Sequence, residues 1–367
     1  MRLRELLDVL EEIAPTRNAE SWDNVGLLVG DPNQDISKAI LTIDYTPEVT
    51  VEAQGEACDV VIAYHPPLFE AVKRVTATGS SAAIFDAIRR GVAIYSPHTA
   101  LDVADGGTND MLADAIGIEP SSRGPLRLVE PKARQYKLVT FVPPKDLARV
   151  SEALFNAGAG RIGNYTHCSF RSPGTGTFFG EEGTNPAVGK SGRLEEAEEV
   201  KLETVLPIAR LNEALAALRA SHPYEEPAFD LVQLAAPPEK LGQGRIGRLS
   251  PTPRTSLIER IKRQLGLPHV LVAGPTEGNA TTAACCAGSC GDLLNDAIAQ
   301  KADLYLTGEM RHHDALKAAR AGMTVVCTLH SNSERAVLKR LKARLADLAP
   351  SLTTVLSRQD RDPFAVR

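Results

Sequence analysis

The chain has 367 residues, which is enough for two or three domains and for a core that needs no disulfides. Hydrophobic residues make up 43% of it and charged residues 24%, proportions that exclude disordered, collagen-like and coiled-coil proteins. A net charge of −5 and an aromatic content of 5% argue against general nucleic-acid binding.

The first residues, MRLRELLDVLEEIAP, combine a helical spacing of leucines with acidic side chains. This pattern predicts an amphipathic helix over residues 3–13 and not a signal peptide. No apolar run approaches the roughly 18 residues of a membrane span, so we expect no membrane partner. The six cysteines have neither paired zinc spacing nor the density of a secreted scaffold, which favours a cytoplasmic protein with reduced thiols.

Strand and helix patterns alternate through residues 1–130. Short apolar runs at 40–43, 60–63 and 92–95 are typical of buried parallel strands, and a helix is expected at 82–90. Such alternation predicts a layered α/β domain.

The pattern changes near Pro131. Strands are expected at 136–142, 164–171, 174–179, 200–206 and 228–234, and helices at 145–156 and 210–220. The break between the second and third of these strands is expected at Ser172 and Pro173. Apart from a long polar hairpin at residues 180–199, this order approaches β-α-β-β-α-β, the order of the ferredoxin-like fold. A linker is then indicated by Pro237 and Pro238 and by the glycine-rich segment 242–247.

The α/β pattern returns after residue 255. Helices are expected at 256–265, 293–300, 315–321 and 333–345, and strands at 269–273, 280–287, 304–307 and 324–328. The simplest architecture is a discontinuous α/β domain, formed by residues 1–130 and 239–367. A ferredoxin-like module, residues 131–238, is inserted between its halves.

The two outer halves also resemble each other. The first contains CDVVIAYHPP, a helix and GVAIYSPHTALD, and the second contains ADLYLTGEMRHH, a helix and GMTVVCTLHSNSE. A generic strand-helix-strand unit would give the same rhythm, but it would not repeat the ending His-x-x-x-acid. We therefore expect an internal duplication.

The repeated endings are His98 to Asp102 and His330 to Glu334. Each follows a buried strand, where open α/β sheets usually carry their ligand sites. If a helix starts there, the imidazole and the carboxylate lie on one helix face and can bind one divalent ion, such as Zn, Mn or Fe. The alternative is structural, with each His capping a helix and each acid solvated. His65, held after another strand end by two prolines, is the third candidate ligand.

Other residues carry weaker indications. The glycine-rich turn with Gly288, Ser289 and Gly291 could bind an anion such as a phosphate, or could simply allow close strand–helix packing. The neighbouring cysteines have no metal spacing and are expected to be small buried residues. His313 precedes a helix and is either a residue beside the metal ligands or a structural cap.

These motifs, together with SWDNVGLLVGD, HPYEEPAFDL, GQGRIG, CAGSCGDLL and TGEMRHHDAL, resemble those of the Ngg-interacting-factor-three-like family, whose members are also called GTP cyclohydrolase I type 2 homologues. They follow one another in the family's order over nearly the whole chain. The resemblance implies a two-metal site in an α/β fold, often within a ring-shaped hexamer. It also implies that the inserted module is similar to the trimeric PII and CutA proteins.

The resemblance implies roles for single residues as well. His65 and Asp102 correspond to ligands of one metal, His330 to a ligand of the other, and Glu334 to the bridge between them. The family usually has His-His-Pro in its first segment, and Tyr64 stands here in place of the first His. The second metal would then keep only His330 and Glu334. The family also usually has Gly before the last His, where this chain has a leucine.

The leading hypothesis is a divalent-metal-dependent hydrolase of the GTP cyclohydrolase or nucleotide type, with one or two metals per chain. In it, His98 or His313 would transfer protons, and the substrate would be a nucleotide or another phosphate-bearing small molecule. The alternative is a non-catalytic metal-binding or regulatory protein, such as a metal store or chaperone. In either case the expected partner is the chain itself, in a homo-oligomer that is most simply a hexamer.

Overall fold

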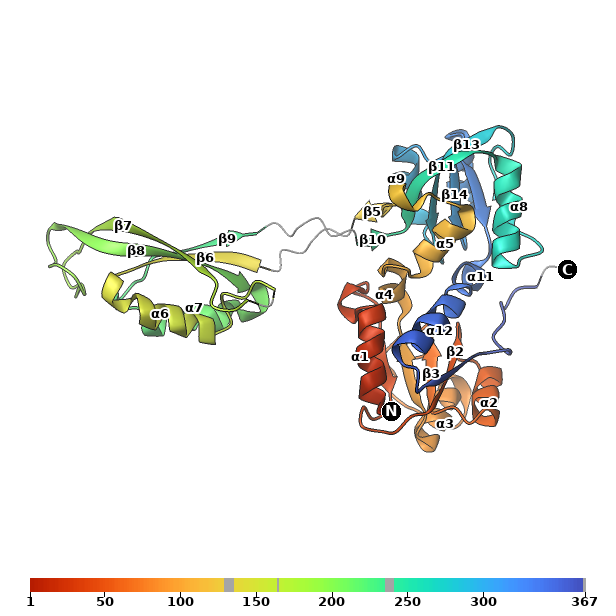
Figure 1. Cartoon of the computed structure of the whole chain (residues 1–367), viewed down its shortest axis with the longest axis horizontal. Coiled ribbons are helices and arrows are strands. Elements are labelled where there is room, and N and C mark those ends of the chain that lie inside the picture. Colours follow the sequence, from red (N-terminus) through yellow and green to blue (C-terminus); the bar gives the residue numbers. More distant parts are fainter. Residues whose placement is uncertain (129–134, 164, 235–240, 366–367) are drawn as a thin grey trace. The chain divides into compact units, whose positions relative to one another are not determined.

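The computed structural model describes residues 1–128, 135–163, 165–234 and 241–365, which form two compact units (Figure 1). The outer unit consists of Met1–Val129 and Lys240–Arg367, and the inserted module consists of Glu130–Glu239. The α/β fold with an inserted module, as predicted from the sequence, is confirmed. Within the described ranges, no helix is both long and apolar enough to cross a membrane.

The outer unit contains two five-stranded sheets. The first has the order β1 (Gly26–Val29), β4 (Ala93–Ser96), β3 (Val60–Ala63), β2 (Lys38–Thr42) and β16 (Thr353–Leu356). The second has the order β11 (Arg245–Pro253), β13 (Asn279–Cys286), β14 (Leu304–Thr307), β15 (Thr324–Cys327) and β12 (Leu271–Ala273). In each sheet the three central strands are parallel. The edge strand β1 runs antiparallel to β4, and the edge strand β12 runs antiparallel to β15. The shared plan agrees with the predicted duplication.

Ten helices are described in this unit. They are α1 (Leu3–Ile13), α2 (Pro47–Gly55), α3 (Ala82–Arg90), α4 (His98–Val103), α5 (Thr108–Ile116), α8 (Arg254–Leu265), α9 (Leu294–Ala299), α10 (His312–Arg320), α11 (His330–Glu334) and α12 (Val337–Leu348). The predicted helix at 333–345 is in fact two helices, α11 and α12. The amphipathic first helix is confirmed, and it buries Leu3, Leu6, Leu10 and Ile13.

The helices α5 and α12 are exchanged between the two sheets (Figure 1). Helix α5 follows the first sheet in the chain, yet its Leu112 and Ile116 pack with α8 and with β13 of the second sheet. Helix α12 follows the second sheet, yet its Leu338 and Leu341 pack in the core of the first sheet beside α1. The exchange ties the two halves into one unit, because neither sheet has a complete core of its own.

The segment 242–247 is not the linker that its glycines predicted, while Pro237 and Pro238 lie outside the described residues. It forms β10 (Gly242–Gln243), which pairs with β5 (Arg127–Leu128), and the start of β11. A Cβ atom on Gly242 would lie 2.2 Å from the carbonyl oxygen of Arg127, and one on Gly247 would lie 2.5 Å from Ile118. These glycines therefore permit close packing rather than flexibility.

The inserted module has an antiparallel sheet with two helices. Its elements are β6 (Gln135–Val142), α6 (Leu147–Asn156), β7 (Ser169–Phe179), β8 (Leu194–Pro207), α7 (Leu211–Ser221) and β9 (Phe229–Gln233), with strand order β7-β8-β6-β9. The two helices pack on one face of the sheet over Leu138, Leu202 and Leu206. The predicted break at Ser172 and Pro173 is wrong, since β7 runs through both. Because β7 is an edge strand, a proline without an N–H is tolerated there.

Candidate metal centre

Three strand ends of the outer unit bring the candidate ligands together. Tyr64 and His65 directly follow β3, Asp102 lies on α4 after β4, and His330 and Glu334 lie on α11 after β15. Helices α4 and α11 begin at His98 and His330, so each imidazole and the acid four residues later lie on one helix face. The site thus lies at the carboxyl ends of parallel strands from both sheets.

Glu334 lies between two imidazoles. Its Oε2 is 3.2 Å from Nε2 of His65, and its Oε1 is 3.3 Å from Nε2 of His330. One ligand atom from each of the three side chains falls within 4.8 Å of the others. These three residues, called the metal cluster below, present two nitrogens and a carboxylate to one small volume.

Carboxylates hold the far side of both imidazoles. Nδ1 of His65 is 2.9 Å from Oδ1 of Asp44, and Nδ1 of His330 is 3.4 Å from Oε1 of Glu309. Such partners orient a metal-binding imidazole and increase its basicity. Neither carboxylate was among the ligand partners predicted from the sequence motifs. The sequence signal that could have indicated them is their position. Asp44 comes two residues after the end of β2 at Thr42, and Glu309 comes two residues after the end of β14 at Thr307.

The burial and the charges of the metal cluster fit a divalent cation. Oε2 of Glu334 is buried and accepts no hydrogen bond from any described residue, which is costly for a carboxylate oxygen unless a cation pairs with it. Gly288 approaches so closely that a Cβ atom there would lie 3.0 Å from Oε1 of Glu334. Burial opposes a charge on His65, but its interactions with the carboxylates of Asp44 and Glu334 more than offset this and raise its pKa to about 10. The site therefore already favours positive charge.

Asp102 is outside the metal cluster but lines the same cavity, beside Tyr64. Tyr64 is fully buried, and its hydroxyl donates a hydrogen bond to Oδ1 of Asp102 and accepts one from Thr108 at 3.4 Å. Burial, reinforced by the charges of Asp102 and Glu334, raises the pKa of the Tyr64 phenol well above its ordinary value. Tyr64 is thus a hydrogen-bond donor to a candidate ligand.

A cavity of about 610 Å³ opens over these residues. His98 lines it, and its Nδ1 is 2.8 Å from Oδ1 of Asp23, a buried carboxylate that also accepts hydrogen bonds from Thr99. At the same cavity lie Trp22 and Phe69, which are 59% and 50% exposed, with their ring centres 6.0 Å apart. Asp23 and Trp22 were not among the predicted site residues, although both lie in the motif SWDNVGLLVGD.

The remaining candidates lie at different places. Gly288 and Ser289 line the cavity, but the N–H of Gly288 donates to Oγ of Ser333 at 2.8 Å. Gly291 begins a short 3-10 helix beside this lining. His313 is exposed in the first turn of α10 and is not among the lining residues.

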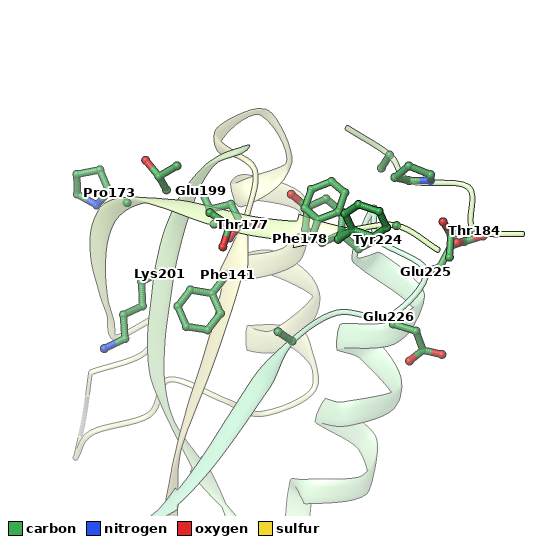
Figure 2. Close-up of a pocket in the computed structure, with 18 of the residues that line it drawn as sticks. Phe141, Pro173, Thr177, Phe178, Thr184, Glu199, Lys201, Tyr224, Glu225 and Glu226 are labelled. Carbon is green, nitrogen blue, oxygen red and sulfur yellow. The ribbon is translucent and has the colours of Figure 1, made fainter. Parts of the chain in front are cut away.

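The inserted module has a cavity of its own, of about 660 Å³, next to β7 and the segment around Tyr224 (Figure 2). Phe141, Phe178 and Tyr224 supply apolar lining, and its charged residues are Glu199, Lys201, Glu225 and Glu226. Among the residues that the structure describes, this lining holds no group of three metal-binding side chains of the kind found in the outer unit. Its lining is mainly apolar.

Comparisons with known proteins agree over the whole length of the chain. The family model Duf34/NIF3 (NGG1p interacting factor 3) matches residues 1–363. A GTP cyclohydrolase 1 type 2 homolog of Halalkalibacterium halodurans is 36% identical over 366 residues, which cover 98% of this chain and 97% of that protein. The Bacillus subtilis homolog of the same name is 32% identical over 372 residues, with coverages of 98% and 97%.

Solved structures of similar proteins have the same fold. A Bacillus cereus protein related to NIF3 is 33% identical, with a TM-score of 0.68 and coverage of 100% of this chain and 99% of that one. A Staphylococcus aureus protein is 27% identical, with a TM-score of 0.80 and the same coverages.

Proposed function

The chain belongs to the Duf34/NIF3 family, and we propose that it binds divalent metal ions at a site formed by His65, Asp102, His330 and Glu334 and hydrolyses a nucleotide or a related nitrogen heterocycle there. The observation that carries the proposal is the buried carboxylate of Glu334 between two oriented imidazoles, with an Oε2 atom that accepts no hydrogen bond from the described residues. Nitrogen and carboxylate donors suit Zn, Mn or Fe(II). A cation bound there would lower the pKa of water and polarise the substrate.

The first metal position would be held by His65, Asp102 and Glu334. A second position would keep His330 and share Glu334, and it would be weaker because Tyr64 brings a protonated hydroxyl that is already committed to Asp102. The proposal is therefore one tightly held ion per chain, with a second ion bound weakly.

His98 is proposed to transfer protons at its Nε2. Its Nδ1 is held by Asp23, so the opposite ring nitrogen is the one left for a proton donor or acceptor at the cavity. The exposed rings of Trp22 and Phe69 support a flat, ring-containing substrate that stacks at the cavity mouth.

The cavity lining constrains the rest of the substrate. Among the described residues that line it, none is Lys or Arg, whereas Glu20, Asp44 and Asp292 add negative charge. A phosphate tail would therefore depend on the metal for its charge compensation. A free base or a nucleoside needs no such compensation.

The test is turnover by protein loaded with Mn²⁺, Zn²⁺ or Fe²⁺ on matched sets of base, nucleoside and triphosphate. We expect turnover of at least one ring-containing compound, lost in Glu334→Gln and reduced in His98→Asn, with unchanged circular dichroism in both variants. His313→Asn is the matched control, because His313 is exposed away from the cavity, and it should retain activity. Retained turnover in Glu334→Gln would contradict the proposal.

The second candidate is a non-catalytic metal store or chaperone. The hydrogen bond between Tyr64 and Asp102 favours it, because it leaves one of two possible metal positions poorly provided with ligands. Tight metal binding without turnover of any compound in the matched sets would support this candidate.

We also propose that the chain forms a homo-oligomer larger than a dimer, most simply a hexamer, through the inserted module. On the strands of the module's sheet, four large apolar side chains are more than half exposed: Phe170, Phe179, Leu194 and Val232. Surfaces of this kind usually contact another protein. Light scattering at micromolar concentration tests the proposal, and a monomeric mass would contradict it.

A further inference from the structure

Two cysteines bracket the glycine turn that packs against the metal cluster. Cys286 ends β13 and is buried, and Cys290 follows the turn and is half-buried at the cavity. We propose that these two thiols form a reversible disulfide, and that its formation weakens metal binding at Glu334 and His330. The disulfide is inferred from the positions of the two sulfur atoms alone, whereas the effect on metal binding rests on the proposed function.

The sulfur positions support the pairing. The two Sγ atoms lie 2.6 Å apart, where a disulfide bond needs about 2.05 Å. The Sγ of Cys290 also lies 2.9 Å from the carbonyl oxygen of Ala287, and the carbonyl of Cys290 accepts a hydrogen bond from the Tyr305 hydroxyl at 3.0 Å. The neighbouring Cys285 contacts the carbonyl of Asn109 instead, as expected for the next residue of a strand. Bond formation therefore needs only a small movement of the turn.

The turn between the cysteines contacts both sides of the metal site. Gly288 lies against Glu334 and donates its N–H to Ser333, the residue just before it. The N–H of Ala287 donates to the side chain of Asn109 at 2.9 Å, and that side chain donates to the carbonyl of Asp102 at 3.0 Å. Closing the turn with a covalent bond would therefore shift groups that position Glu334 and Asp102.

The chemistry balances with a peroxide as the oxidant. The sulfur of Cys290, which is the more accessible of the two, attacks the peroxide O–O bond, becomes a sulfenic acid and releases one water. The thiol of Cys286 then attacks that sulfur, the S–S bond forms, and a second water leaves. Two thiols thus lose two electrons and two protons to one hydrogen peroxide, and a small dithiol reductant reverses the reaction by exchange.

The experiment treats the full chain with a stoichiometric amount of hydrogen peroxide and measures thiols, intact mass and Mn²⁺ affinity. Mn²⁺ is the probe because it prefers nitrogen and oxygen to thiolate ligands. We expect a loss of about 2 Da, a peptide linking Cys286 to Cys290, and roughly tenfold weaker Mn²⁺ binding, all reversed by the reductant. Cys290→Ser should bind Mn²⁺ as the reduced protein does and should not respond to peroxide. Cys168→Ser, altered in the inserted module, is the matched control and should respond fully.

The outcomes separate the two claims. Absence of the linked peptide in peroxide-treated wild type would overturn the dithiol. A linked peptide with unchanged Mn²⁺ affinity would overturn its effect on metal binding. If neither redox form binds Mn²⁺, then the proposed metal site fails, while the peptide still decides the dithiol. Cys290→Ala gives a second test in case the serine variant does not fold.

Discussion

The hydroxyl of Tyr64 donates a hydrogen bond to Oδ1 of Asp102, so a buried phenol fixes one of the candidate metal ligands. Tyr64 thus acts on the metal site as a hydrogen-bond donor to Asp102, at a position where a histidine would bring a metal ligand.

Replacing Tyr64 by His should raise the metal content toward two ions per chain. A neutral imidazole binds first-row divalent ions far better than a protonated phenol does. Tyr64→Phe is the matched control, because it removes the hydroxyl without adding a ligand and should not raise the metal content. The measurement is metal content by mass spectrometry after dialysis against a weak chelator. Two tightly held ions in the wild type, unchanged in Tyr64→His, would refute this account.

Glu334→Gln should abolish the stabilisation that metal gives to the protein. The variant keeps the shape of the side chain but removes the charge that a cation would neutralise. A ligand at 100 times its Kd stabilises the native state by about 2.7 kcal/mol, so the wild-type Tm should rise with Mn²⁺ and the variant Tm should not. Thermal unfolding with and without Mn²⁺ checks both expectations, and an equal rise in Tm would contradict them.

Leu329→Gly should stabilise the chain. Leu329 precedes α11 with φ of 70° and ψ of 159°, a conformation that is nearly confined to glycine and costs other residues about 1–3 kcal/mol. Relief of this strain should outweigh the lost contacts of a partly exposed side chain, so we expect a gain of about 1 kcal/mol. Leu329→Ala loses the same contacts without relieving the strain, and it should destabilise the protein. Denaturant unfolding of both variants decides, and a glycine variant no more stable than the alanine one would disprove the argument.

Asp59 and Asp303 should stabilise their sheets in the same pH-dependent way. Oδ2 of Asp59 accepts hydrogen bonds from Ser37 and from the N–H of Lys38, and Oδ2 of Asp303 accepts the same set from Thr281 and Thr282. Burial opposes ionisation at both positions, but these hydrogen bonds outweigh it and lower the pKa of each carboxyl.

A lowered folded-state pKa adds stability that is complete above the unfolded pKa of about 3.9 and is lost as the pH falls through the folded value. Asp59→Asn and Asp303→Asn should each cost about 1 kcal/mol at pH 7. The difference from the wild type should shrink below pH 4. Urea unfolding at pH 7 and pH 3 measures it, and a cost that persists undiminished at pH 3 would count against the mechanism.

Replacing residues 133–237 by a short Gly/Ser linker should leave a folded outer unit that still binds metal. The two sheets of that unit share exchanged helices, and the metal cluster draws on residues of the outer unit alone. Circular dichroism, thermal unfolding and metal content test this. An unfolded product would show that the outer halves depend on the module.

The sequence alone determined the alternation of strands and helices in the outer unit, its duplication, the spacing of His330 and Glu334 on one helix face, and the family, which the comparisons confirm. These features depend on periodicity and on motifs, which are properties of neighbouring residues in the chain. The tertiary structure decided which carboxylates hold the imidazoles, since Asp44 reaches His65 and Asp23 reaches His98 across 21 and 75 residues. It also decided that α5 and α12 cover each other's sheets, because an apolar helix face shows only that it must be buried and not against which sheet.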